Sequence, residues 1–125
     1  MEIEINEDSV ELLDKYTKIR PSTIELILER IIREWTDSEA KKWVQNPILF
    51  RTLAKLPKEK TMKININHDI AKSYIRTLKK IEDKLEIQID PSKLASFLAK
   101  AFIHKYNIKY MESSYKEKFG QIRKV

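Results

Sequence analysis

The sequence contains no cysteine and only one glycine among its 125 residues. Without cysteine the chain can form no disulfide, hold no metal through thiolates and use no cysteine nucleophile. No apolar run reaches the roughly 20 residues that a helix needs to cross a bilayer, and the N-terminal segment lacks the apolar core of a signal peptide. We therefore expect a soluble cytoplasmic protein that has no membrane partner.

The motifs of common enzyme sites are missing as well. The sequence has no glycine-rich phosphate-binding loop, no serine triad and no paired carboxylates at a recognisable elbow. Its two histidines, His68 and His104, have no third ligand at a spacing typical of a zinc site. We expect no catalytic residues, no metal, no other cofactor and no small-molecule substrate.

Positive charge is unevenly distributed along the chain. Residues 1–60 carry 11 Lys/Arg and 12 Asp/Glu, a net charge of −1, whereas residues 61–125 carry 14 and 7, a net charge of +7. Such asymmetry favours a polyanionic partner for the second half. The alternative explanation is a solvated, lysine-rich surface.

A short segment occurs twice. Met1–Asp8 matches Met62–Asp69 at five of eight positions, and both copies alternate apolar and polar residues as a half-buried strand does. A lone strand cannot satisfy its own backbone hydrogen-bonding groups. The repeat therefore predicts two strands, over residues 1–6 and 61–67, that pair with each other or with a second chain.

Two amphipathic helices are expected after each strand. In the first copy Asn6 can cap a helix that ends before Pro21, and the next helix begins with Pro21 as its first residue or with Ser22 as its cap. In the second copy a helix covers about 68–85, and Asp90 caps the next one. Matching Pro21-Ser22 to Pro91-Ser92 aligns the apolar stripes of the two second helices: Ile24, Ile27 and Leu28 fall on Leu94, Phe97 and Leu98.

The pattern divides the chain into four segments and predicts a mainly α fold with a short β-ribbon. Residues 1–36 form the first strand-helix-helix unit and residues 61–107 the second. Residues 37–60 form a connector that fits two short helices, because they contain no glycine or serine run. Residues 108–125 form a C-terminal helix and a basic tail.

This repeated unit resembles the ribbon-helix-helix superfamily of DNA-binding proteins, the class of the Met and Arc repressors. The alternating strands, the apolar stripes and the serine at each second-helix start carry the resemblance, and the tandem form is similar to regulators described from archaeal viruses. The resemblance implies an antiparallel ribbon whose outer side chains enter the major groove of DNA. Met62, Ile64 and Ile66 would then point inward.

The resemblance assigns the outward side chains to base reading. Lys63 can donate to guanine and Asn65 can pair with adenine, with Thr61 beside them. Pairing between two chains would set Glu4 against its twin, and like charges directly opposite are destabilising. We therefore favour pairing within the chain, an intrachain pseudo-dimer that sets Glu4 near Asn65 and Asn6 near Lys63, with Glu4 and Asn6 as further readers.

The starts of the second helices are candidates for phosphate binding. A helix N-terminus offers unpaired N–H groups and a positive dipole end to an anion. Ser92 and Lys93 can add a hydroxyl and an ammonium at one start, and Ser22 with Arg20 can do so at the other. Such contacts position a protein on DNA without reading its sequence.

These features predict a sequence-specific double-stranded DNA-binding transcription regulator, with two or more copies of the chain on neighbouring sites. A plasmid partition or relaxosome accessory protein would use the same contacts, since a fold does not fix a biological role. The same pattern is also compatible with a helical interaction module that binds no DNA and with an antitoxin that binds a protein partner.

Overall fold

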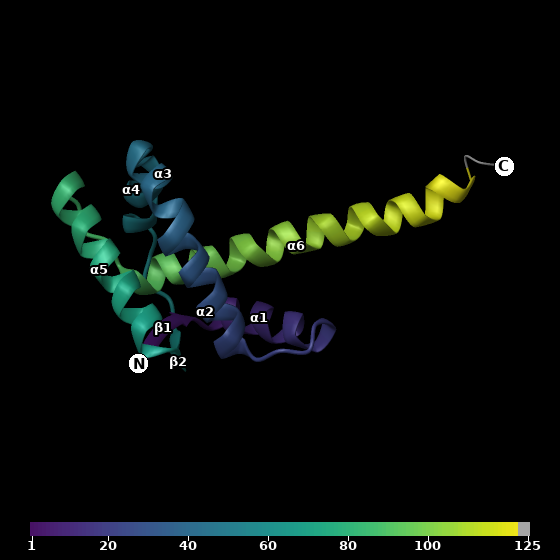
Figure 1. Cartoon of the computed structure of the whole chain (residues 1–125), viewed down its shortest axis with the longest axis horizontal. Coiled ribbons are helices and arrows are strands. Elements are labelled where there is room, and N and C mark those ends of the chain that lie inside the picture. The colour runs from purple at the N-terminus through teal and green to yellow at the C-terminus, as the bar shows by residue number, and fades with distance from the viewer. Residues whose placement is uncertain (123–125) are drawn as a thin grey trace.

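The computed structural model describes the backbone of residues 1–122 and the side chains of residues 1–106. It is mainly helical and contains one two-stranded antiparallel sheet, as the sequence predicts. The elements follow one another along the chain (Figure 1) as β1 (Glu2–Asn6), α1 (Glu7–Ile19), α2 (Ile24–Glu34), the π-helical turn η1 (Trp35–Glu39), α3 (Ala40–Gln45), α4 (Ile48–Ala54), β2 (Thr61–Asn65), α5 (His68–Leu85) and α6 (Pro91–Ile122).

The two strands of the chain pair with each other and form the ribbon. Five residue pairs join them, with Glu4 and Lys63 in the middle, and hydrogen bonds from Ile66 N to Met1 O and from Glu7 N to Lys60 O extend the ladder at both ends. The inward isoleucines are all buried, as the alternation predicts: Ile3, Ile5, Ile64 and Ile66.

The register differs from the expected one by two residues. Glu4 lies opposite Lys63 and Asn6 opposite Thr61, whereas Asn65 lies opposite Glu2. A two-residue slip keeps every side chain on its face of the ribbon, so the alternation alone cannot select between these registers. The observed register sets the carboxylate of Glu4 directly across from an ammonium.

The prediction that Met62 points into the core is also wrong, because its side chain is 46% exposed. Met1, which occupies the matching position of the first strand, is 48% exposed. The helices beneath the ribbon therefore bury its four isoleucines and leave Met1 and Met62 outside the core.

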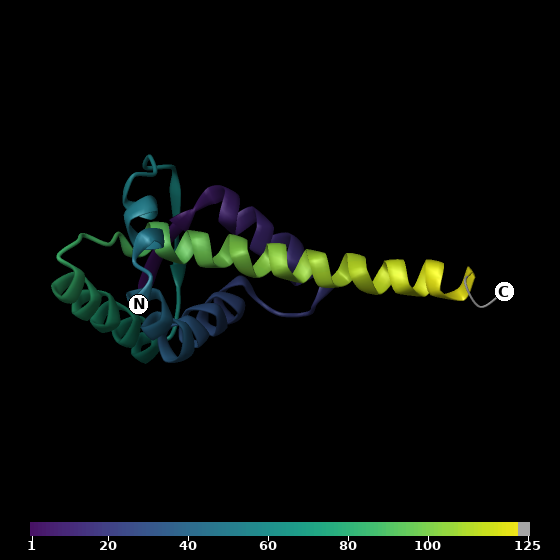
Figure 2. The same ribbon diagram turned by 90° about the horizontal axis from the view of Figure 1, so that it is seen from above.

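The helices cover the ribbon crosswise. α6, from the second half of the chain, packs on β1 and α1 of the first half. α2, from the first half, packs on β2 and α5 of the second half, and α2 and α6 also contact each other. Each half therefore closes the core of the other, and neither strand-helix-helix segment forms a separate body. Figure 2 shows α6 continuing well past this crossed layer.

The second helices begin at positions that differ from the expected alignment. α2 starts neither at Pro21 nor with Ser22 as its cap: the side chain of Thr23 accepts from Leu26 N at 3.2 Å. In α6 the cap is Asp90, as expected, and its carboxylate accepts from Ser92 N at 2.9 Å. Aligning the two caps shifts the helices by three residues, and the buried stripes then coincide: Ile27, Leu28, Ile31 and Ile32 match Leu94, Ala95, Leu98 and Ala99.

The core continues from the ribbon into an aromatic cluster. Trp35 makes edge contacts with three other rings, those of Trp43, Phe50 and Tyr74, at centroid distances of 5.6, 6.4 and 6.0 Å. Tyr74 is fully buried, and its hydroxyl donates to Pro91 O at 2.7 Å. This bond ties α5 to the beginning of α6.

Two expected segment boundaries do not interrupt the helices. The helical chain runs from Ile24 to Gln45 through the π-helical turn, without a break after residue 36. Likewise α6 is one helix through residue 107 and on to Ile122, and the basic tail residues Arg123 and Lys124 lie outside the described part. No helix in that part combines the length and the apolar character that a bilayer span requires.

Candidate nucleic-acid interface

The outer face of the ribbon carries three cross-strand rows of polar side chains. These rows are the pairs Glu2 with Asn65, Glu4 with Lys63, and Asn6 with Thr61. Residues two apart on a strand are separated by about 6.8 Å, so the rows span about 14 Å, which corresponds to about four base pairs of DNA. Asn6 is half-buried, and the other five side chains are exposed.

The charges of this face are mixed. Lys63 Nζ lies 3.9 Å from a carboxylate oxygen of Glu2, and both side chains are largely exposed, at 66% and 61%. An exposed ion pair of this kind contributes little to stability, so the lysine can leave it at small cost. Together with Glu4, the rows carry two carboxylates and one side-chain ammonium, and the amino group of Met1 beside Asn65 adds one further positive charge, so the ribbon alone has no net attraction for a polyanion.

Asn65 is held in place by the beginning of the chain. The amino group of Met1 donates to Asn65 Oδ1 at 3.0 Å and to Ile66 O at 3.0 Å. The amide oxygen of Asn65 is thereby partly occupied, and the amide nitrogen is left to donate to an acceptor on a base edge.

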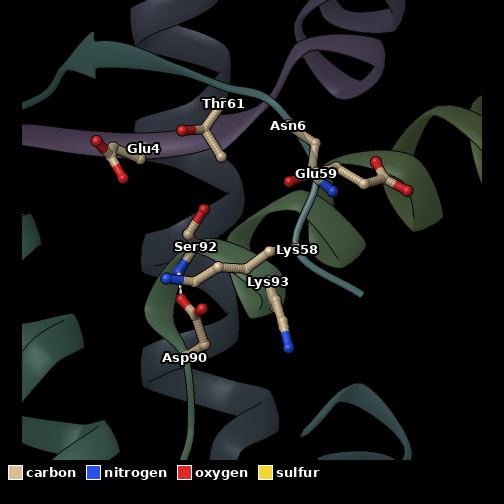
Figure 3. A pocket seen from close by; sticks show the side chains of 8 residues that line it. All are labelled: Glu4, Asn6, Lys58, Glu59, Thr61, Asp90, Ser92 and Lys93. Carbon is tan, nitrogen blue, oxygen red and sulfur yellow. Dashed lines mark hydrogen bonds between the residues drawn. The ribbon is translucent and has the colours of Figure 1, made fainter. Parts of the chain in front are cut away.

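A pocket of about 190 Å³ lies between the ribbon and the beginning of α6 (Figure 3). It brings together five of the residues that the sequence predicts as DNA contacts. Three are expected base readers and two are expected phosphate contacts: Glu4, Asn6 and Thr61 from the ribbon, and Ser92 and Lys93 from α6. Lys58 and Glu59, from the segment before β2, and Asp90 complete the lining.

The beginning of α6 offers less to an anion than its sequence suggests. The N–H of Ser92 already donates to the Asp90 carboxylate. The hydroxyl oxygen of Ser92 is covered, and it has no hydrogen-bond partner among residues 1–106. Any attraction for a phosphate at this pocket therefore rests on the ammonium groups of Lys93 and Lys58.

These two lysines occupy different sides of the pocket. In Figure 3 the side chain of Lys58 extends toward the start of α6. Lys93 is half-buried, and its ammonium makes only a long contact, 3.5 Å, to Ala54 O. Neither lysine forms an ion pair with a residue whose side chain the structure describes.

Arg20 and Ser22 are not brought to this pocket. Both lie in the turn after α1, whose 13 residues extend about 20 Å away from the ribbon (Figure 1). The guanidinium of Arg20 sits 5.8 Å from the centre of the Tyr106 ring on α6. Ser22 is exposed, one residue before the actual cap of α2.

Three residues that shape the interface are not predicted by the sequence pattern. Lys58 and Glu59 belong to the segment that leads into the second strand, and their charges are the signal that could have indicated them. Ser96 supports the ribbon from beneath: its Oγ accepts from Asn6 N at 2.8 Å and donates to Ser92 O at 2.7 Å. A single serine within an apolar helical stripe gives no indication of this role.

The exposed side chains of this interface are suited to polar recognition. No three His, Cys, Asp or Glu side chains among the described residues lie close enough together to hold a metal ion. The exposed rows offer hydrogen-bond donors on β2 and acceptors on β1. Comparisons of the chain with protein-family models, with curated proteins and with solved structures found no match.

Proposed function

We propose that this protein is a sequence-specific double-stranded DNA-binding transcription regulator. Two ribbon-helix-helix units, joined by the connector, form an intrachain pseudo-dimer, and the ribbon reads the major groove. The observation that carries the proposal is the ribbon itself: three exposed polar rows stand on four buried isoleucines, over a crossed pair of helices. A two-stranded ribbon fits the major groove, which is about 12 Å wide.

The expected readers are Lys63 and Asn65, on the exposed face of β2. An ammonium donates to guanine O6 and N7, and an asparagine amide pairs with adenine. Since three rows span only about four base pairs, one chain reads a short site. We therefore propose that two or more copies bind adjacent sites on DNA.

Affinity in this proposal comes from beside the ribbon rather than from the ribbon. The outer rows carry a net charge of −1, and the pocket beside them holds two lysines, Lys58 and Lys93, among the carboxylates of Glu4, Glu59 and Asp90. Lysines that neutralise phosphates release counterions, and binding then weakens as salt increases. The excess positive charge of residues 61–125 acts in the same direction.

One observation favours a different function. Glu2 and Glu4 occupy two of the six outer positions, and a carboxylate approaches a phosphate backbone only at an electrostatic cost. This suits a helical interaction module whose ribbon faces another protein. The distinction is experimental, because such a module would show no salt-dependent affinity for DNA.

The test measures the affinity of the full chain for DNA by fluorescence anisotropy between about 50 and 300 mM salt. Binding that neutralises phosphates weakens by about 0.9 log unit per phosphate for each tenfold rise in salt. We expect such a decline, and we expect Lys63→Ala to relax base preference at one position. Lys42→Ala is the matched control, because Lys42 is an exposed lysine on α3 that pairs with Glu39. A flat salt response, or no binding at low salt, would contradict the proposal.

A further inference from the structure

The two halves of the fold are related by an approximate two-fold axis through the Ile3–Ile64 pair. The relation matches residue n of the first strand with residue n + 61 of the second, and the register obeys it: the pair Glu2–Asn65 maps onto the pair Glu4–Lys63. Met1 and Met62, matched in the same way, have nearly equal exposure.

Two hydrogen bonds beneath the ribbon obey the same relation. Asn6 and Asn67 occupy matched positions, each directly before the first helix of its half. The N–H of Asn6 donates to Ser96 Oγ on α6 at 2.8 Å, and the N–H of Asn67 donates to Glu29 Oε1 on α2 at 2.7 Å. Ser96 and Glu29 each lie six residues after the cap of their helix. The backbone that presents the ribbon is therefore symmetric in its register and in its supports.

The side chains on the outer face break this symmetry. The axis exchanges Glu2 with Lys63 and Glu4 with Asn65. An ionised carboxylate only accepts hydrogen bonds and an ammonium only donates them, while an amide does both. Glu2 and Lys63 therefore present opposite chemistry to whatever lies above the ribbon, and Glu4 and Asn65 present different chemistry.

A symmetric ribbon dimer reads a palindrome, because the two-fold axis of the protein coincides with that of the site. We infer that one chain reads a non-palindromic site with two dissimilar halves. The axis passes between Lys63 and Asn65, so one half holds Lys63 with Glu4 and the other holds Asn65 with Glu2. Lys63 faces a guanine edge and Asn65 an adenine edge, and Glu2 or Glu4 accepts from the N4 amino group of cytosine, the base edge that suits a carboxylate. This inference rests on the proposed function, and it fixes the orientation of the protein on its site.

The two halves can be made chemically alike by changing the exposed face of β1. Glu2→Lys together with Glu4→Asn gives these two positions of β1 the residue types of their matched positions in β2, Lys63 and Asn65. Both side chains are exposed, so the buried face of the ribbon is unchanged. The charge control is Glu11→Lys with Asp14→Asn, which makes the same change in charge on the exposed surface of α1.

The experiment is random-site selection on double-stranded DNA with the full-length protein and both double variants. We expect the natural chain to select a non-palindromic motif. The Glu2→Lys, Glu4→Asn variant should select an inverted repeat, because each half of its ribbon then presents one lysine and one asparagine, and should bind that repeat at least about tenfold more tightly than the natural chain does. The charge control should keep the natural motif.

Each other outcome overturns the inference in a recognisable way. A motif that is palindromic within the span of one ribbon, or the same motif from the natural chain and the β1 variant, refutes the asymmetry and leaves the DNA-binding function standing. Binding without any motif refutes the asymmetry and the sequence specificity, and leaves only non-specific DNA binding. Absence of binding removes the proposed function as well. The single change Glu4→Asn repeats the test with a smaller perturbation, if circular dichroism shows that the double variant is unfolded.

Discussion

The carboxylate of Asp8 on α1 lies 2.6 Å from the ammonium of Lys100 on α6, so that the first helix of one half is tied to the last helix of the other. The hydrogen bond from Lys100 lowers the pKa of Asp8 below its ordinary value of 3.8, against the opposing effect of partial burial. The pair thus links the crossed helices outside the apolar core, at a point where both side chains remain about half exposed.

This pair predicts a change of stability with pH. Because the folded-state pKa of Asp8 is lowered, its contribution is fully present above pH 3.8 and is lost as the pH falls through the folded-state value. Asp8→Asn should therefore cost less than about 1 kcal/mol at pH 7, since the pair is partly exposed, and the difference from the natural chain should shrink at about pH 3. Urea unfolding at both pH values measures it. Asp14→Asn, which breaks only an exposed pair with Lys18 within α1, is the control.

The inner face of the ribbon offers a matched pair of substitutions, one at a buried position and one at an exposed position. Ile5 is fully buried and lies opposite Met62, which is 46% exposed. We expect Ile5→Ala to lower the free energy of unfolding by about 2–4 kcal/mol and Met62→Ala to lower it by less than about 1 kcal/mol. Equal losses in denaturant unfolding would show that the ribbon does not rest on the helices as described.

Tyr74 makes the stability of the fold depend on pH in the alkaline range. Burial, and to a lesser extent the nearby charge of Asp90, raise the pKa of its hydroxyl well above 10. The unfolded chain loses this proton near pH 10 whereas the folded chain keeps it, so stability should fall as the pH rises above 10. Tyr74→Phe removes that dependence, and at pH 7 it costs about 1–3 kcal/mol, because Pro91 O loses its donor. Thermal unfolding at about pH 7 and about pH 10.5, on either side of the ordinary tyrosine pKa, compares the two proteins.

The beginning of α6 predicts unequal roles for two neighbouring residues. Lys93→Ala should weaken DNA binding about equally across sequences and should reduce the log–log salt slope by about 0.9. Ser92→Ala should leave DNA binding unchanged, because its hydroxyl is covered and has no partner within the described residues. The same anisotropy titrations separate them, and a loss of affinity in Ser92→Ala would mean that the helix start opens toward DNA.

Some of this fold follows directly from the sequence. Alternation over two short segments correctly identifies the strands and the four isoleucines that they bury. Register does not follow, since a two-residue slip leaves every face unchanged. The cap of α2 does not follow either. Pro21, Ser22 and Thr23 all suit a helix start, and the choice of Thr23 puts Ile27 and Leu28 against the other half of the molecule.

The continuous helix from Ile24 to Gln45 shows a different limit of sequence reasoning. Thr36, Asp37 and Ser38 are residues that favour a helix end or a new cap. The structure instead inserts a π-helical turn, in which Ala40 N donates to Trp35 O. A π turn brings residues five apart onto one face, so both Trp35 and Ala40 are buried. The π-helical turn goes with the burial of the Trp35 indole ring, and the helix and cap preferences of single residues do not indicate such a turn.

The sequence predicts most residues of the candidate interface, but it does not predict that they meet at one pocket. The strand pattern indicates Glu4, Asn6 and Thr61, and a helix start indicates Ser92 and Lys93, but only the crossing of α6 over β1 places them around one pocket. Analogy between the two units predicts that Arg20 is a phosphate contact like Lys93. Its actual position beside Tyr106 depends on the length of α1, which carries the turn away from the ribbon.

Because β1 and β2 belong to one polypeptide, the ribbon assembles in a unimolecular reaction. A ribbon shared between two subunits dissociates on dilution, and its stability depends on protomer concentration. Here dilution cannot separate the strands. Subunit exchange with a related protein cannot mix them either, so β1 and β2, whose outer residues differ, always form the same ribbon.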